Sequence, residues 1–224
     1  MKRPEVIIAI VAIASISVGS AAFAEKLTDL AQQAEIDTKV GKHLNAYEAM
    51  RKATLQVWDA GPLLFRKAVF VAGTASGFGI YDPRSNNVFK PGEKLVIYAE
   101  PIGFKWQAKD ELQHALLVAD IVIRAEDGNV VASQKNFGEF KFDSREQNME
   151  VMTVLTIGFP GAPAGKYVQE VRFIDKMSDK TGKFELPFEI KTTSDEGPST
   201  NSVGGVDTGS DLGLDDLNGL GSLD

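Results

Sequence analysis

The hydrophobic residues of this chain change their spacing once, near residue 67, and that change limits what the chain can fold into. From there to residue 191, apolar residues alternate with polar ones or form short apolar blocks, separated by clusters of Gly, Pro, Asn and Asp. In the last block, the residues predicted to face the core are Phe184, Leu186, Phe188 and Ile190. The pattern predicts a mainly β domain over residues 67–191, built as an antiparallel sandwich of about seven strands.

We expect these strands at residues 68–72, 94–100, 112–124, 130–142, 151–157, 167–174 and 183–191. The segment 126–129 (Glu-Asp-Gly-Asn) is the strongest hairpin signal of the chain. Pro187 has no N–H group to donate, so either the last strand is predicted at a sheet edge or its proline faces away from the neighbouring strand. The chain has no Cys and therefore lacks the disulfide of antibody domains. An immunoglobulin-like fold of the fibronectin-III or general Greek-key kind is expected instead.

Residues 25–66 have the composition of a helical segment that leads into the sandwich. A second helix is expected from Leu44 to Ala60, because Gly61 and Pro62 then stop it. Its partly polar stripe includes Leu44, Tyr47, Met50, Thr54, Val57 and Trp58. Two interpretations stay open: the stripe covers the open face or end of the sheet, or it is a helix for dimerisation or for a partner.

Residues 1–24 have the pattern of a secretory signal peptide. Lys2 and Arg3 precede the apolar run 6–18, and 22–24 (Ala-Phe-Ala) is a small-x-small cleavage site. Cleavage predicts a periplasmic or secreted protein without membrane contact, whereas the alternative is that the segment is kept as an anchor. Without Cys, an exported chain must be held together by its packed core.

The acidic charge is concentrated at the C-terminal end. The whole chain has 24 basic and 31 acidic residues, yet residues 192–224 hold seven acids and no Lys or Arg. This Gly-, Ser- and Asp-rich stretch predicts a disordered tail. Four of its leucines recur every third residue, at 214, 217, 220 and 223, and leave a docking motif open as the alternative to a solubilising tail. The remaining residues are nearly neutral, so a nucleic-acid partner is not expected.

The segment 78–100 carries a resemblance. Its runs F-G-x-Y-x-x-R and F-x-P-G-E-x-L-x-x-Y-x-E resemble uncharacterised exported bacterial proteins, including proteobacterial ones, with an N-terminal helix and an immunoglobulin-like sandwich. The matching residues are Trp58, Pro62 to Phe65, Phe78, Gly79, Tyr81, Arg84, Phe89, Pro91, Gly92, Glu93, Tyr98 and Glu100. The resemblance covers about residues 44–191. It implies a periplasmic location and a sandwich fold, and it implies no activity.

Catalytic motifs are missing from the sequence. It has two His, His43 and His114, no Cys, and neither a G-x-S-x-G nor an H-E-x-x-H motif. Two His without Cys are too few for a typical zinc site. We therefore expect no catalytic residue, no cofactor and no metal, and a protein that is not an enzyme. A hydrolase of unknown type stays as an alternative, because acidic residues are numerous.

The segment 78–106 offers the best candidate binding surface, which comprises Tyr81, Arg84, Glu100, Phe104 and Trp106. In one interpretation, exposed aromatic rings anchor a ligand while Arg84 and Glu100 give specificity. In the other, Arg84 pairs with Glu93 or Glu100 and clamps the loop. The expected function is a non-enzymatic binding or envelope-structural protein that contacts another envelope protein. The first alternative is a carbohydrate- or peptidoglycan-binding module with a glycan ligand.

Overall fold

The structure is a computed structural model, and it describes residues 17–192. The chain divides into two units, Met1–Thr192 and Thr193–Asp224. Residues 1–16 of the predicted signal peptide and residues 193–224 of the predicted tail lie outside the described part. Helix α1 (Ser17–Lys39) begins within the predicted signal peptide, so the predicted cleavage site after Ala24 falls inside this helix. In the described part, neither helix is long and apolar enough to cross a bilayer.

Helix α1 and helix α2 (His43–Ala60) form a helical hairpin. Gly41, at φ +76°, allows the tight turn between them. The contact between the helices is made by small side chains, because Ala34 packs with Ala46 and Ala49, and Leu30 is half-buried beside them. The hairpin therefore buries little apolar volume between its own helices.

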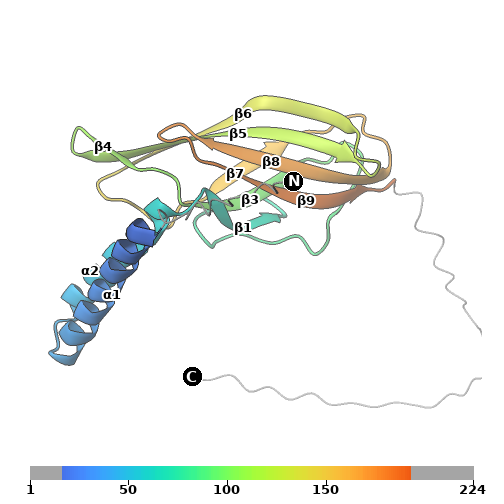
Figure 1. Cartoon of the computed structure of the whole chain (residues 1–224). Helices are drawn as coiled ribbons and strands as arrows, with labels where there is room; N and C mark the ends of the chain where they lie inside the picture. Colours follow the sequence, from blue (N-terminus) through green and yellow to red (C-terminus); the bar gives the residue numbers. More distant parts are fainter. Residues whose placement is uncertain (1–16, 193–224) are drawn as a thin grey trace, which may run out of the picture. The chain divides into compact units, whose positions relative to one another are not determined.

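Two sheets make up the sandwich (Figure 1). The smaller has the order β1-β3-β7, with β1 at Leu64–Phe70, β3 at Leu95–Ile102 and β7 at Thr153–Ile157. The larger has the order β2-β9-β8-β5-β4, and β6 also pairs with β5. Its strands are β2 (Val88–Phe89), β4 (Gln107–Lys109), β5 (Leu112–Ala125), β6 (Val130–Ser144), β8 (Gly165–Asp175) and β9 (Thr181–Ile190). All pairings are antiparallel except the short one between β2 and β9.

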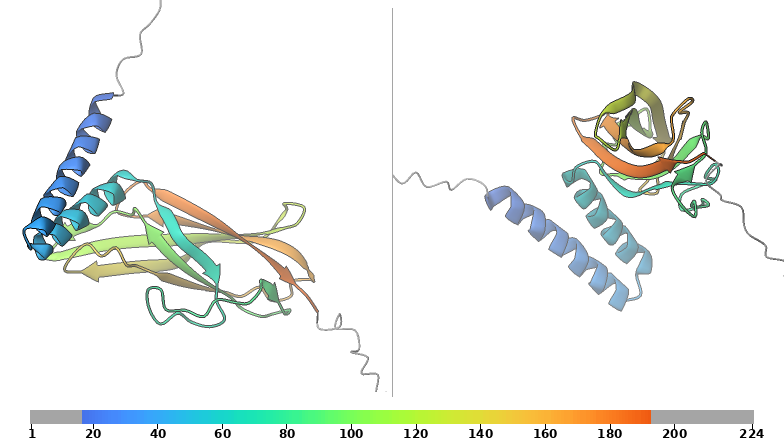
Figure 2. Two further views of the ribbon diagram at one scale, coloured as in Figure 1. Left: turned by 90° about the horizontal axis from the view of Figure 1, so that it is seen from below. Right: turned by 90° about the vertical axis from the view of Figure 1, so that its right-hand side faces the viewer.

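The core lies between the two sheets, which Figure 2 shows from two further sides. Alternation along the strands supplies it: in β8, Tyr167, Val171 and Phe173 are buried while their neighbours face outward. Aromatic rings connect the layers, since Phe65 of β1 meets Phe173 of β8 and Phe184 of β9 at centroid distances of 5.1 and 4.7 Å. These edge-on contacts are a favoured geometry for aromatic pairs.

The predicted mainly β, sandwich-like architecture is confirmed, with two differences in the strands. Strand β1 begins at Leu64, four residues before the predicted start, and the short strands β2 and β4 were not predicted. The turn at 126–129 joins β5 to β6 as expected. Strand β9 pairs with β8 along its length and with β2 at Glu189 and Ile190 only. Strand β9 is therefore not the outermost strand as predicted, but Pro187 lies outside its pairing with β2, so the missing N–H interrupts no pairing there.

Trp58 joins the helical hairpin to the sandwich. Its ring belongs to the main core cluster and meets Phe104 edge-on at 5.1 Å, and its indole N–H donates to the Phe104 carbonyl at 2.7 Å. Lys180 supports the same joint, because its ammonium donates to the carbonyls of Asp59 and Gly103. Of the predicted stripe, Trp58 enters the sandwich core at the end of α2. Leu44, Tyr47, Met50 and Val57 are exposed and do not cover a sheet.

We predict that Gly103→Ala destabilises the fold more than Gly128→Ala. Both glycines have positive φ, +81° and +84°, so both substitutions carry the strain of that conformation, about 1–2 kcal/mol. A Cβ at Gly103 would also lie 2.2 Å from the Pro62 carbonyl oxygen, whereas nothing lies within 4 Å at Gly128. Overpacking adds about 1–3 kcal/mol at Gly103. Urea denaturation measures the difference, and equal losses for the two variants would contradict the close contact at the joint.

Candidate functional site

Arg84 holds the loop between β1 and β2. Its guanidinium donates to the Glu93 carboxylate at 2.7 Å and to the carbonyls of Val88 and Asn86, at 2.8 and 3.3 Å. It also lies 4.1 Å from the centre of the Phe89 ring. The donors of Arg84 are thus used inside the protein. Of the two predicted partners, Glu93 is the one that pairs with Arg84, and the predicted loop clamp is present.

The Glu93 carboxylate completes this clamp across the Pro91-Gly92 turn. Burial alone would raise the pKa of Glu93, but hydrogen bonds from the Lys90 N–H and from Arg84 outweigh it and hold the pKa below the ordinary 4.5. The carboxylate therefore stays ionised under neutral conditions and serves a structural contact.

Glu100 lies in a separate buried cluster on β3. Tyr98 donates its hydroxyl to Glu100 at 2.7 Å and accepts the Gly79 N–H at 2.7 Å. Burial and the neighbouring carboxylate raise the pKa of Tyr98 to about 12. Arg66 reaches Glu100 at 2.6 Å, because the register of β1 shifts between Phe65 and Lys67 and gives Arg66 its place there. Glu100 is thus a buried structural carboxylate and offers no exposed specificity contact.

The predicted exposed aromatic anchors are largely wrong. Phe104 and Trp106 are in the core, with relative exposures of 0% and 3%. After the turn at Gly103 the ring of Phe104 lies against Trp58 and Phe142, and the ring of Trp106 lies against Phe104. Tyr81 is half-buried and stacks on Tyr98 at 4.2 Å. The five predicted residues therefore do not form one exposed surface.

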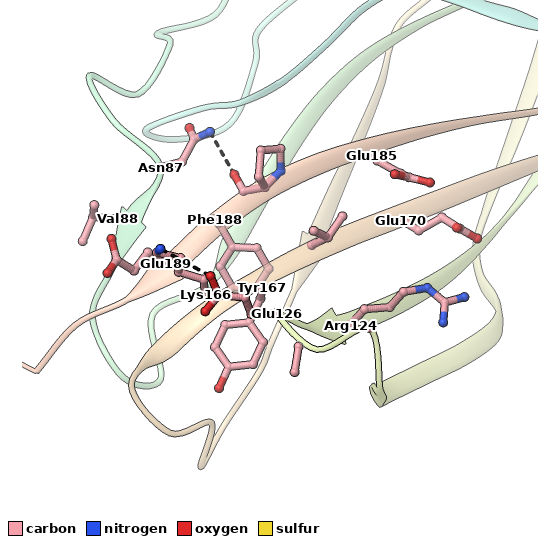
Figure 3. Close-up of a pocket in the computed structure, with 14 residues that line it drawn as sticks. Asn87, Val88, Arg124, Glu126, Lys166, Tyr167, Glu170, Glu185, Phe188 and Glu189 are labelled. Atoms are coloured by element: carbon pink, nitrogen blue, oxygen red, sulfur yellow. Dashed lines mark hydrogen bonds and ion pairs between the residues drawn. The ribbon is translucent and has the colours of Figure 1, made fainter.

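A surface hollow of about 550 Å³ lies over β5, β8 and β9 (Figure 3). Its apolar floor includes Val168, Pro187 and parts of Tyr167 and Phe188. Figure 3 shows Arg124, Glu170 and Glu185 on one side, with the Lys166–Glu126 ion pair on another. No local sequence motif indicates this hollow, since its residues come from β2, β5, β8, β9 and the turn after β5. The alternation of charged residues in 183–191 was the available signal.

The charges of this hollow largely satisfy one another. Glu170 and Glu185 are direct cross-strand neighbours, and the Lys183 ammonium lies 3.4 and 2.9 Å from their carboxylates. The Lys183 hydrogen bond, helped by the charge of Arg124, holds the pKa of Glu185 below its usual value. A general acid at neutral pH needs a raised carboxyl pKa, so Glu185 is not set for that role.

His114 forms a pair with Asp143 beside a second hollow, of about 360 Å³. Nδ1 lies 2.5 Å from the Asp143 carboxylate and Nε2 lies 3.1 Å from the Lys109 carbonyl. Through these two contacts the ring of His114 on β5 links β6 and β4. The residues lining this hollow include no Ser, Thr or Cys that could act as a nucleophile. In residues 17–192, no three His, Asp or Glu side chains lie together as metal ligands.

Helix α2 carries a surface with a different character. Four large apolar side chains point into solvent along it, with exposures of 71%, 62%, 48% and 55%: Leu44, Tyr47, Met50 and Val57. We call these four residues the hairpin face. Next to it a groove of about 610 Å³ runs between α1 and α2. The sequence pattern identified these residues as one stripe. It did not indicate that Ala46, Ala49 and Ala53 would be buried while the larger side chains stay exposed.

Comparisons with known proteins give no family. No protein-family model and no curated protein sequence matches the chain. Weak structural similarity exists to a superoxide reductase (neelaredoxin) from Ignicoccus hospitalis, with 7% identity and a TM-score of 0.32 over 57% of this chain and 82% of that one. Spo0M, a sporulation control protein from Bacillus subtilis, has 10% identity and a TM-score of 0.31 over 59% and 50%. Scores this low carry no argument about function.

We predict that Glu93→Gln lowers the free energy of unfolding at pH 7 by about 1 kcal/mol, a modest value because the ion pair is partly exposed. The pKa of Glu93 is depressed in the folded state, so its contribution is present above the unfolded pKa and is lost as the pH falls through the folded pKa. The difference between variant and wild type should therefore shrink at acidic pH.

Urea denaturation at neutral and acidic pH measures this effect. Glu139→Gln is the matched control, because Glu139 is exposed and has no ion pair within the described residues. Equal losses for the two variants at pH 7 would show that the clamp does not stabilise the loop.

Proposed function

We propose that this protein is a non-enzymatic binding or envelope-structural protein that acts through protein–protein contact, and that the hairpin face is its contact surface. The observation that carries the proposal is the exposure of Leu44, Tyr47, Met50 and Val57 on one ordered helix. Covering a large apolar side chain is worth about 1.5–3 kcal/mol, so a partner that covers several of them gains substantial affinity. Exposed apolar surface of this kind marks interaction sites in soluble proteins.

The arrangement of side chains favours a protein partner over a glycan. Trp106 and Phe104, the aromatic rings expected to form a platform for a sugar, are buried in the core, and Tyr47 is the one aromatic residue of the hairpin face. On the hairpin, the exposed residues are mostly aliphatic, which suits a helical partner laid along the groove. The hairpin region 25–60 holds five Lys or Arg and six Asp or Glu, so its binding does not depend on a strongly charged partner.

We further propose that the sandwich is of the immunoglobulin or fibronectin-III kind. The sheet order β1-β3-β7 corresponds to strands A, B and E of that fold, and β9-β8-β5-β6 corresponds to G, F, C and C′. In this proposal the sandwich is a scaffold that presents the hairpin through the Trp58 joint. An exported, periplasmic location remains our proposal from the sequence of residues 1–24.

Photo-crosslinking in the producing cells tests the proposed contact. A photoreactive amino acid at Tyr47 is expected to give discrete protein adducts, because this position would lie inside the interface. Val131 on β6 is the matched control: it is an exposed apolar residue at 47% and lies outside the hairpin. Adducts at Val131 without adducts at Tyr47, Met50 or Val57 would contradict the proposed contact surface.

A further inference from the structure

Helix α2 has two apolar seams, and within residues 17–192 one of them has a partner. The first consists of Ala46, Ala49 and Ala53, of which Ala46 and Ala49 pack against Ala34 of α1. The second consists of Tyr47, Met50, Thr54 and Val57, all exposed. Its first three members each follow a residue of the first seam directly in the sequence. One residue in an α-helix is a rotation of about 100°, so the second seam faces sideways from the first.

The second seam has the spacing of a coiled-coil contact. Its members are separated by three, four and three residues, as the a and d positions of a heptad are. Thr54, the polar member, donates its hydroxyl to the Met50 carbonyl at 3.0 Å within the helix. That bond satisfies the hydroxyl, so Thr54 can be covered by an apolar surface without an unpaired donor.

The groove beside this seam leaves space for another helix. It has a volume of about 610 Å³, and small side chains, Ala31, Ala34 and Ala46, line it between the larger Tyr47 and Met50. Its rim carries the Glu35–Lys39 ion pair, whose charges already balance each other. A helix can therefore approach closely without burying an unpaired charge.

We propose that the occupant is a second copy of this chain, and that two hairpins pack through the Tyr47–Val57 seam as a four-helix bundle. The inference rests on the proposed function, in which the hairpin is a contact surface. In such a bundle each helix faces two neighbours about 90° apart, close to the angle between the two seams of α2. The described part of the chain supplies two helices, and a two-fold axis supplies the same two again.

Charge distinguishes the second copy from the acidic C-terminal segment as occupant. The hairpin region 25–60 holds five basic and six acidic residues, so two copies repel each other little. Residues 193–224 hold seven acids and no base, and nothing in the nearly neutral hairpin attracts them. A two-fold contact needs a surface that fits itself, and an apolar seam with balanced flanking charge meets that requirement.

Sedimentation equilibrium of the full chain, as isolated from producing cells, tests the dimer across the micromolar range. We expect a concentration-dependent mass that approaches twice that of the monomer. The double substitution Met50→Gln and Val57→Gln does not weaken the helix itself, because Gln has a helix propensity similar to that of Met and higher than that of Val. It should raise the dissociation constant of the dimer at least about tenfold. Val130→Gln with Val131→Gln, at exposed residues of β6, is the matched control and should leave the mass unchanged.

Disulfide cross-linking locates the contact, and the chain has no Cys of its own to interfere. Mild oxidation should link Thr54→Cys into dimers but should not link Lys52→Cys, which lies on the opposite side of α2. A chain that stays monomeric, with Thr54→Cys unlinked, overturns the second copy as occupant. If the photo-crosslinker at Tyr47 then still captures a different protein, the proposed function survives; if it captures nothing, both fail. Reactivity of Thr54→Cys that rises when residues 193–224 are deleted would assign the seam to that segment instead.

Discussion

The hydrogen bond from the Trp58 indole to the Phe104 carbonyl, together with the edge-on contact of their rings, connects the helical hairpin to the sandwich core. A buried indole N–H without a partner would cost about 1–3 kcal/mol, so Phe104 must stay in place for Trp58 to enter the core. Gly103 makes this possible, because it turns the chain at positive φ and lets the Pro62 carbonyl approach closely. The same contact explains why Phe104 is buried and is not the exposed anchor that the sequence predicted.

The hairpin has an unusual distribution of side chains. Its own helices meet through Ala34, Ala46 and Ala49, and each buried methyl group contributes about 0.8 kcal/mol. Such a contact is weak against the conformational entropy of ordering two helices. The larger side chains of α2 face solvent instead. A partner on the second seam would supply the apolar burial that the pair of helices lacks, which is why we place the function of this protein on the hairpin.

Much of the sandwich could be predicted because alternation with period two is a local signal. Strands β5 and β9 and the turn 126–129 were found in this way. Strands β2 and β4 have two and three residues, too few to show a period, and the register shift near Arg66 hides the start of β1. These strands form because neighbouring strands pair with them, and the residues of those neighbours are distant in the sequence.

The candidate site could be predicted only where the residues in contact are close together in the sequence. Arg84 and Glu93 are nine residues apart across one turn, and their pairing was among the predicted alternatives. Arg66 is far from Glu100, and Trp58 is 46 residues from Phe104, so neither contact could be derived from the pattern. The alanine seam was overlooked because large apolar residues dominate a periodicity analysis, whereas close helix packing favours small ones.

Amide hydrogen exchange of α2 tests whether a second copy of this chain covers the Tyr47–Val57 seam and so stabilises the hairpin. The measurement compares residues 47–57 at two protein concentrations about a hundredfold apart, with β3 as the internal reference. We expect exchange in α2 to slow at the higher concentration, because the second seam becomes covered, while exchange in β3 stays the same. Identical exchange of α2 at both concentrations would contradict stabilisation of the hairpin by a second copy.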